Sequence, residues 1–156
     1  MKYESSIKTV GYPQGSVYAK LADLNNLQSV KQRLDDPDIQ QRLHEQVPED
    51  KIESVRQHIE SLEVDTDSVS VDAGMIGRLT IRIVDREEPK CVKFQSVNSP
   101  IGFKLWVQLL PMTEESCKMK LTVDADVNPF MRMMVEKPLK EGIEKLADML
   151  ASLPYN

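Results

Sequence analysis

Histidine and cysteine are the residue types in this chain with the widest chemical repertoire, and each occurs twice. His44 and His58 lie in an acidic stretch that contains no cysteine, so their spacing does not predict a metal site. Cys91 and Cys117 have no histidine close in the sequence that could activate a thiolate, and a free cysteine usually packs as a small hydrophobic residue. We therefore expect solvent-facing histidines, reduced cysteines, and neither a metal nor another cofactor.

Phosphate and nucleic-acid chemistry are also disfavoured. The six glycines form no G-x-G-x-x-G or Walker-type loop. The net charge is −5, and residues 35–72 hold twelve acids against three bases, which leaves about +4 on the rest of the chain. Because phosphate neutralisation dominates nucleic-acid affinity, a chain without a basic stripe is a poor candidate for that partner.

The length and hydropathy of the chain predict its domain number and its relation to membranes. A chain of 156 residues is expected to form one domain, residues 1–156, and to bury roughly 70% of its unfolded surface. No apolar run reaches the ~20 residues that a membrane span needs, and the start MKYESSIK has no signal-peptide core. We expect a cytoplasmic protein without integral membrane association.

The last segment, residues 128–153, is predicted to be one long amphipathic helix. Asn128 can cap its first turn, and Pro129 suits the first helical position. Its apolar residues recur at steps of three and four, which places them on one face: Val135, Leu139, Ile143, Leu146, Leu150 and Leu153. Such a stripe must be buried against a broad apolar surface.

The earlier chain offers that surface as a sheet. Period-2 alternation predicts about seven strands, at residues 3–10, 62–64, 69–71, 78–84, 90–97, 103–111 and 117–127. Two short helices are predicted at residues 13–24 and 26–34. After a turn at residues 35–38, two acidic helices are predicted at residues 39–46 and 48–62. Short connections favour antiparallel neighbours with one apolar face, so we expect a curved antiparallel sheet wrapped around the last helix.

Two passages carry a resemblance to a known superfamily. SSIKTVGYPQGSVYAKLADLNNL resembles the opening of the START-like helix-grip proteins, also called SRPBCC, which include birch-pollen-allergen and polyketide-cyclase proteins. A second passage is similar to their last two strands and closing helix: LWVQLLPMTEESCKMKLTVDADVNPFMRMMVEKPLKEGIEKLADMLASLPY. Its NPF and KPL…GIEKLAD motifs resemble those of uncharacterised bacterial members. The resemblance covers residues 1–34 and 62–156 and implies an α+β helix-grip fold. Residues 35–61 depart from it as an acidic helical insertion.

The leading functional hypothesis is a binding or carrier protein for a hydrophobic or amphipathic, lipid-like small molecule, held between the sheet and the last helix. Ser5, Tyr18 and Ser96 are candidate polar anchors. The predicted lining combines inward strand positions with residues of the last helix: Leu79, Ile81, Phe94, Phe103, Leu105, Val107, Met119, Leu121, Phe130, Met131, Met134, Pro138 and Gly142.

Three features of the last helix leave alternatives open. Phe130, Met131, Met133 and Met134 are either ordinary core or an adaptable lip on the cavity. Pro138 is expected to kink the helix, either to follow the sheet or to let its first half move. Gly142 indicates either close packing against the sheet or space for a ligand.

Two other function classes remain as hypotheses. A cyclase or hydrolase of the same superfamily would need a general acid or base facing the cavity, and the predicted inward positions hold neither a histidine nor a carboxylate. An interaction module would use residues 35–61 to bind a basic protein partner, although acidic runs are more often solvated surface.

Overall fold

An eight-stranded antiparallel sheet and one long helix form the body of the computed structural model, which describes residues 2–32, 36–46, 48–72, 78–97, 102–153 and 155. The strand order is β1-β8-β7-β6-β5-β4-β3, and β2 also pairs with β8. The strands are β1 (Lys2–Glu4), β2 (Lys8–Val10), β3 (Glu63–Val64), β4 (Ser68–Asp72), β5 (Arg78–Glu87), β6 (Cys91–Val97), β7 (Gly102–Thr113) and β8 (Ser116–Asp126).

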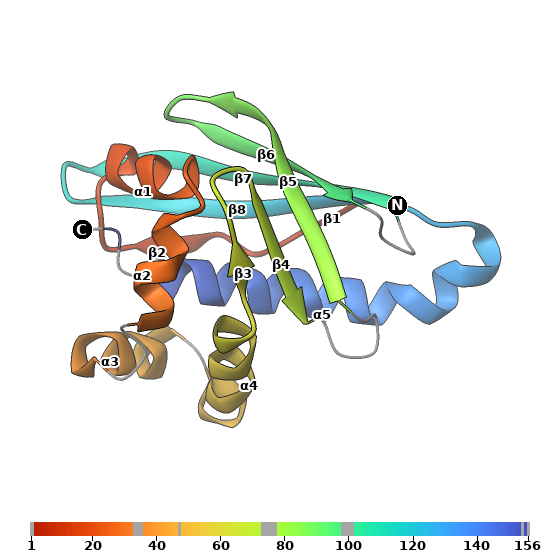
Figure 1. Ribbon diagram of the computed structural model, residues 1–156, viewed down its shortest axis with the longest axis horizontal. Helices are drawn as coiled ribbons and strands as arrows, with labels where there is room; N and C mark the ends of the chain where they lie inside the picture. Colours follow the sequence, from red (N-terminus) through yellow and green to blue (C-terminus); the bar gives the residue numbers. More distant parts are fainter. Residues whose placement is uncertain are drawn as a thin grey trace.

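Five helices accompany the sheet: α1 (Gln14–Leu21), α2 (Asn26–Gln32), α3 (Pro37–Gln46), α4 (Glu49–Glu60) and α5 (Pro129–Ser152). Helix α5 contacts β1, β2 and β8, and α3 packs against α5. Helices α1 to α4 gather around the end of the molecule where α5 finishes, whereas the first half of α5 extends away from them (Figure 1). This arrangement confirms the predicted α+β helix-grip fold.

The first strand differs from the prediction. Residues 3–10 were expected to form one strand, but β1 and β2 pair separately with β8, with Glu4 opposite Thr122 and Lys8 opposite Met119. The first strand therefore contains one more residue than its partner across this interval, which is the signature of a bulge. The Ser5 hydroxyl stabilises it by accepting a hydrogen bond from the Leu121 amide at 2.9 Å.

The inward positions predicted for residues 117–127 are confirmed in β8, whereas Thr122 on the opposite face is also buried, at 3% exposure, and donates to Gln108 Oε1 at 3.2 Å. The inward residues Cys117, Met119 and Leu121 are fully buried, and Lys118, Asp124 and Asp126 are exposed on the other face. On β7, Leu105, Val107 and Leu109 are buried. These two adjacent strands provide the centre of the core on which the second half of α5 packs.

Helix α5 begins and continues as predicted. The Asn128 side chain accepts a hydrogen bond from the Met131 amide at 2.9 Å, and Pro129 occupies the first turn. The helix runs continuously through Pro138. Its buried residues all follow that proline: Ile143, Ala147, Met149, Leu150, Ala151 and Ser152. Pro138 thus separates a largely uncovered first half from a buried second half.

The acidic insertion forms α3 and α4, as expected. Leu43 of α3 is 1% exposed and Leu62, just after α4, is 5% exposed, so the thin apolar edge of each segment is used for packing. Helix α4 contacts α2 and β4. The insertion therefore packs on the sheet and on α2 and α5, at the end of the molecule where α5 finishes. The last residues of the predicted helix at 26–34 fall outside the described residues, as do residues 73–77 and 98–101 between the predicted strands.

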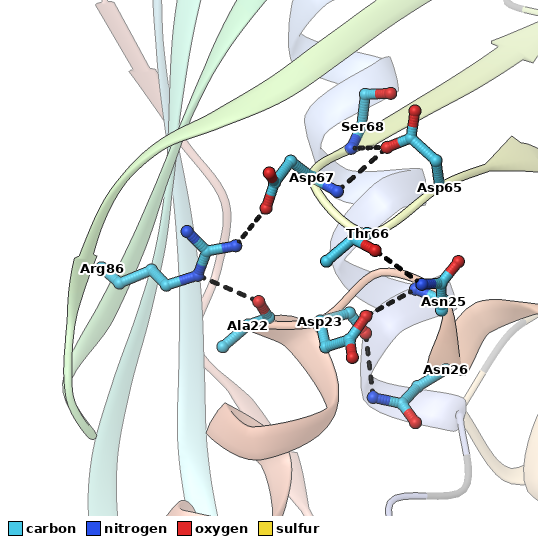
Figure 2. Close-up of polar contacts among 9 residues, drawn as sticks. All are labelled: Ala22, Asp23, Asn25, Asn26, Asp65, Thr66, Asp67, Ser68 and Arg86. Carbon is cyan, nitrogen blue, oxygen red and sulfur yellow. Dashed lines mark hydrogen bonds and ion pairs between the residues drawn. The ribbon is translucent and has the colours of Figure 1, made fainter.

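Arg86 on β5 contacts both the residue that follows α1 and the turn between β3 and β4 (Figure 2). Its Nε donates to the Ala22 carbonyl at 3.0 Å, and its guanidinium pairs with Asp67 Oδ1 at 2.6 Å. Nearby, Asn25 Nδ2 donates to Thr66 Oγ1 at 2.8 Å. The end of α1 and the β3–β4 turn are thereby attached to β5.

We expect Arg86→Ala to lower the free energy of unfolding by about 1.5 kcal/mol, because charged hydrogen bonds to Ala22 and Asp67 are lost while β5 itself remains intact. Urea unfolding followed by Trp106 fluorescence would measure this. Arg82→Ala on the same strand is the control and should change stability by less than about 0.5 kcal/mol. Equal effects of the two substitutions would contradict the proposed link.

Candidate functional site

The concave face of the sheet is built from rows of side chains that the strand register places next to one another. One row is buried at 5% exposure or less and comprises Ile83, Phe94, Leu105 and Val123. The adjacent row runs through Ile81, Ser96, Phe103 and Ala125. These rows define the apolar floor beneath α5.

Burial falls towards the end of the sheet that helices α1 to α4 leave uncovered. Ile81 and Phe103 are only partly buried, as is Leu79 at the start of β5. Ser96 is also partly buried, and its hydroxyl accepts a hydrogen bond from the Phe103 amide at 2.9 Å. We call Leu79, Ile81, Ser96 and Phe103 the open end of the concave face.

The first half of α5 completes this end of the grip. Val135 and Leu139 are partly buried, which places them on the side of the helix nearest the sheet. Four apolar residues in its first two turns are exposed: Phe130 (91%), Met131 (36%), Met133 (88%) and Met134 (78%). We call these four residues the methionine-rich lip. They are not packed as core, so the alternative of ordinary core packing for this segment is wrong.

The structure distributes the predicted lining residues over three environments. Phe94, Leu105, Val107, Met119 and Leu121 are buried in the core. Leu79, Ile81 and Phe103 form most of the open end, and Phe130, Met131, Met134, Pro138 and Gly142 are exposed on α5. A Cβ atom on Gly142 would meet no atom within 4 Å, so close packing against the sheet does not explain that glycine. Contact of this set with a ligand stays a prediction.

Tyr3 is a polar residue at the edge of the floor that was not predicted from the sequence. Tyr3 lies opposite Val123, on the concave side, and its hydroxyl is shielded from solvent beside the Glu136 carboxylate of α5. Burial raises the pKa of the Tyr3 hydroxyl, and the nearby Glu136 carboxylate raises it further. The Lys140 ammonium lies 5.4 Å from the centre of the Tyr3 ring.

The three candidate polar anchors differ in burial, in hydrogen bonding and in their position relative to the open end. The Ser5 hydroxyl is already used, since it donates to the Ser6 carbonyl and accepts from the Leu121 amide. Tyr18 is 7% exposed on α1, and burial raises the pKa of its hydroxyl. Ser96 alone of the three lies at the open end.

The second half of α5 is attached to the sheet by charges. Lys8 Nζ lies 3.0 Å from Glu144 Oε2 and 2.8 Å from Asp148 Oδ1. The Ser6 hydroxyl donates to Glu144 Oε2 at 3.0 Å, and the Ser6 amide donates to Glu144 Oε1. Because Lys8 and Asp148 are largely buried, this cluster holds one end of the helix against β2.

The histidines and cysteines behave as ordinary residues where the structure describes them. His44 is exposed, as expected, and the His58 side chain falls outside the described set. Burial raises the pKa of both thiols, which favours the protonated, unreactive form. No group of three metal-ligating residues occurs in the described segments, nor is any described helix long and apolar enough to cross a membrane.

A hollow in the surface at the β3–β4 turn does not fit the predicted ligand. It measures about 420 Å³ and is lined by Asp65, Thr66, Asp67, Ser68 and Arg82. Asp65 Oδ1 accepts hydrogen bonds from the amides of Asp67 and Ser68. A hydrogen bond from the Ser68 side chain, together with these two, holds the pKa of Asp65 below its ordinary value. These groups stabilise the β3–β4 turn, so we do not assign a ligand to this hollow.

Comparison with solved structures places the fold among known ones. Norcoclaurine synthase from Thalictrum flavum, solved with dopamine and hydroxybenzaldehyde, matches with a TM-score of 0.63 at 12% identity, over 97% of this chain and 85% of that one. A START superfamily protein from Mycobacterium smegmatis gives 0.59 at 12% identity, over 96% and 94%. A conserved protein from Geobacillus kaustophilus gives 0.56 at 16% identity, over 97% and 91%. No family model and no curated protein sequence matches the chain.

Proposed function

We propose, from the START-like helix-grip fold that this chain has, that it is a binding protein for a hydrophobic or amphipathic small molecule. One observation carries the proposal: at the open end of the concave face, the apolar residues Leu79, Ile81 and Phe103 keep part of their surface exposed. Apolar side chains that converge on a concave surface are the usual lining of a small-molecule site.

The methionine-rich lip supports the same proposal. Phe130, Met133 and Met134 are each more than three-quarters exposed, and they lie in the first half of α5, which extends away from helices α1 to α4 (Figure 1). Exposed apolar clusters of this kind mark binding surfaces, and methionine adapts to ligands of different shape. The lip would cover the apolar part of a ligand whose other side rests on the floor.

The test uses N-phenyl-1-naphthylamine, a neutral apolar dye that fluoresces when it leaves water. We expect it to bind the wild-type protein, and Phe103→Ser to weaken binding about tenfold, because an apolar contact worth about 1.4 kcal/mol is removed from the floor. Native mass spectrometry of the freshly purified protein should also show a co-purifying apolar molecule.

Leu110→Ser is the matched control. Leu110 lies on β7 like Phe103, but it is 63% exposed and pairs with Lys118. Its substitution should leave dye affinity unchanged. If both variants bind the dye as the wild-type protein does, the concave face is not the binding site and the proposal fails.

A further inference from the structure

The two halves of helix α5 are held to the sheet unequally. The second half is attached through the charged cluster around Lys8, and all the buried residues of the helix follow Pro138. In the first half, residues 129–137, no residue is buried. This half joins the end of β8 to the attached half beside the open end, because Ala125 near the end of β8 lies opposite Phe103. We call residues 129–137 the strap.

The helix is weakest where its two halves meet. Pro138 has no amide hydrogen, so it cannot donate the usual helical hydrogen bond to the Met134 carbonyl. Gly142, one turn further on, favours the helix less than alanine would. No atom lies within 4 Å of the place where its Cβ would be, so packing does not require a glycine there. Residues 138–142 therefore have the properties of a hinge, and at the other end of the strap Asn128 has an extended backbone.

Tyr3 on β1 contacts the helix on both sides of the proline. Its hydroxyl donates a hydrogen bond to the Glu136 carboxylate of the strap, and the Lys140 ammonium lies 5.4 Å from the centre of its ring. Lys140 Nζ is also 3.5 Å from Glu136 Oε1, so this ion pair spans Pro138. The Tyr3 hydroxyl is shielded from solvent where α5 packs against β1. Tyr3 thus joins the sheet to the strap where the helix is weakest.

We propose that the strap is a hinged cover of the open end, which moves about residues 138–142 to admit and release the ligand, and that Tyr3 with Glu136 is the clasp that holds it closed. This inference rests on the proposed function and states how the same site opens. Opening breaks the clasp and the partial burial of Val135, whereas the cluster around Lys8 stays intact.

Hydrogen exchange of the unliganded protein measures opening without any ligand. A strap that leaves the sheet is too short to remain a stable helix, so the amides of residues 133–142 should exchange faster than those of residues 145–152. Tyr3→Phe keeps the ring and removes the hydroxyl. It should raise exchange of residues 133–142 about fivefold, because a hydrogen bond to a charged group is lost from the closed state.

Two neighbouring substitutions separate the clasp from a general weakening of the helix. Glu136→Ala and Lys137→Ala each remove one member of an i,i+4 ion pair, with Lys140 and Glu141 respectively. Glu136 contacts Tyr3, whereas the Lys137 side chain is 85% exposed. Glu136→Ala should therefore raise exchange of the strap several-fold, and Lys137→Ala should leave it unchanged. Equal effects would refute the clasp.

The hinge is tested by a substitution that makes it more helical. Gly142→Ala adds a methyl group that meets no atom, so it should slow exchange of residues 133–142 about fivefold. Gly15→Ala in α1 is the matched control, since a Cβ atom there also meets no atom within 4 Å. It should not change exchange of the strap. A similar slowing in both variants would refute the hinge.

Stopped-flow mixing with N-phenyl-1-naphthylamine tests whether this motion admits the ligand. If the dye enters only the open protein, its association rate follows the population of the open state. We expect association to be about fivefold faster in Tyr3→Phe and about fivefold slower in Gly142→Ala. Rate changes of opposite sign are not expected if both residues have only a structural role.

The outcomes distinguish this inference from the proposed function. If exchange of residues 133–142 is the same in Tyr3→Phe, Gly142→Ala and the wild type, the clasp and the hinge are both refuted, whatever the dye does. If exchange changes as expected but dye association does not, the strap is not the entrance and the inference fails. If the dye does not bind the wild-type protein, the proposed function is wrong, and exchange alone decides whether the strap opens.

Discussion

Tyr155→Ala is expected to lower the free energy of unfolding by about 4 kcal/mol, comparable to removal of a large aromatic side chain from a core. Tyr155 follows the end of α5 and is 2% exposed. Its hydroxyl donates to the Leu150 carbonyl at 2.6 Å, and its ring meets the Tyr12 ring edge to face at 6.0 Å. Replacement by alanine leaves a cavity beside Cys117 and removes one of the hydrogen bonds to the Leu150 carbonyl, which also accepts from the Leu153 amide.

Urea unfolding monitored by circular dichroism would measure this loss. Tyr155→Phe is the matched control: it retains the ring and removes the hydrogen bond, so we expect a loss of only about 1 kcal/mol. A loss below about 1 kcal/mol for Tyr155→Ala would show that the tail does not anchor α5. Burial raises the pKa of Tyr155 far above its ordinary value, so this hydroxyl stays protonated under all such conditions.

Lys8→Met is expected to cost about 2 kcal/mol at neutral pH, because it leaves Glu144 and Asp148 facing each other with their common cation removed. Lys8 is 18% exposed at its side chain, so water only partly compensates for the loss. Lys137→Met on the exposed face of α5 is the control, and it should cost less than about 0.5 kcal/mol. Similar losses for the two variants would contradict an anchoring role for Lys8.

The same cluster predicts how stability depends on pH. Burial alone would raise the pKa of Glu144, but hydrogen bonds from Ser6 and Lys8 hold it below its ordinary value. A carboxylate with a lowered pKa in the folded state stabilises the protein above its unfolded pKa, and this contribution is lost as pH falls through the folded value. Burial alone would lower the pKa of Lys8, but its bonds to Asp148 and Glu144 raise it, so its contribution is lost at high pH.

Urea unfolding between about pH 7 and pH 3 would test this dependence, since the range covers ordinary carboxylate pKa values. The stability difference between wild type and Glu144→Gln should be largest near neutrality and shrink as the solution is acidified. A difference that stays constant over the whole range would contradict the assigned role of the Glu144 charge.

The regular parts of the fold were predictable because their signals are local. In β8, the side chains alternate without interruption, so Cys117, Met119 and Leu121 could be assigned to the core from the sequence. Asn128 and Pro129 likewise mark the start of α5 by their own chemistry. These predictions need only the periodicity of strands and helices and the preferences of helix ends.

The missed parts depend on contacts between distant segments. The bulge after β1 uses the Leu121 amide as the partner of Ser5, and no property of residues 3–10 alone shows that pairing. Tyr155 follows the periodic segment, so the stripe of α5 could not indicate its burial. Tyr3 and Glu136 lie close together because α5 packs against β1. That packing depends on the arrangement of the whole sheet, so neighbouring residues in the sequence do not reveal it.

The position of β1 and β2 has a consequence for how the chain folds. Both strands pair only with β8, so that Lys2 lies opposite Asp124 and Val10 opposite Cys117. Contacts between residues so distant in sequence require closure of a very long loop, and such topologies fold slowly. On the ribosome, β1 and β2 have no partner among the described strands until β8 has been synthesised, so this edge of the sheet is completed late.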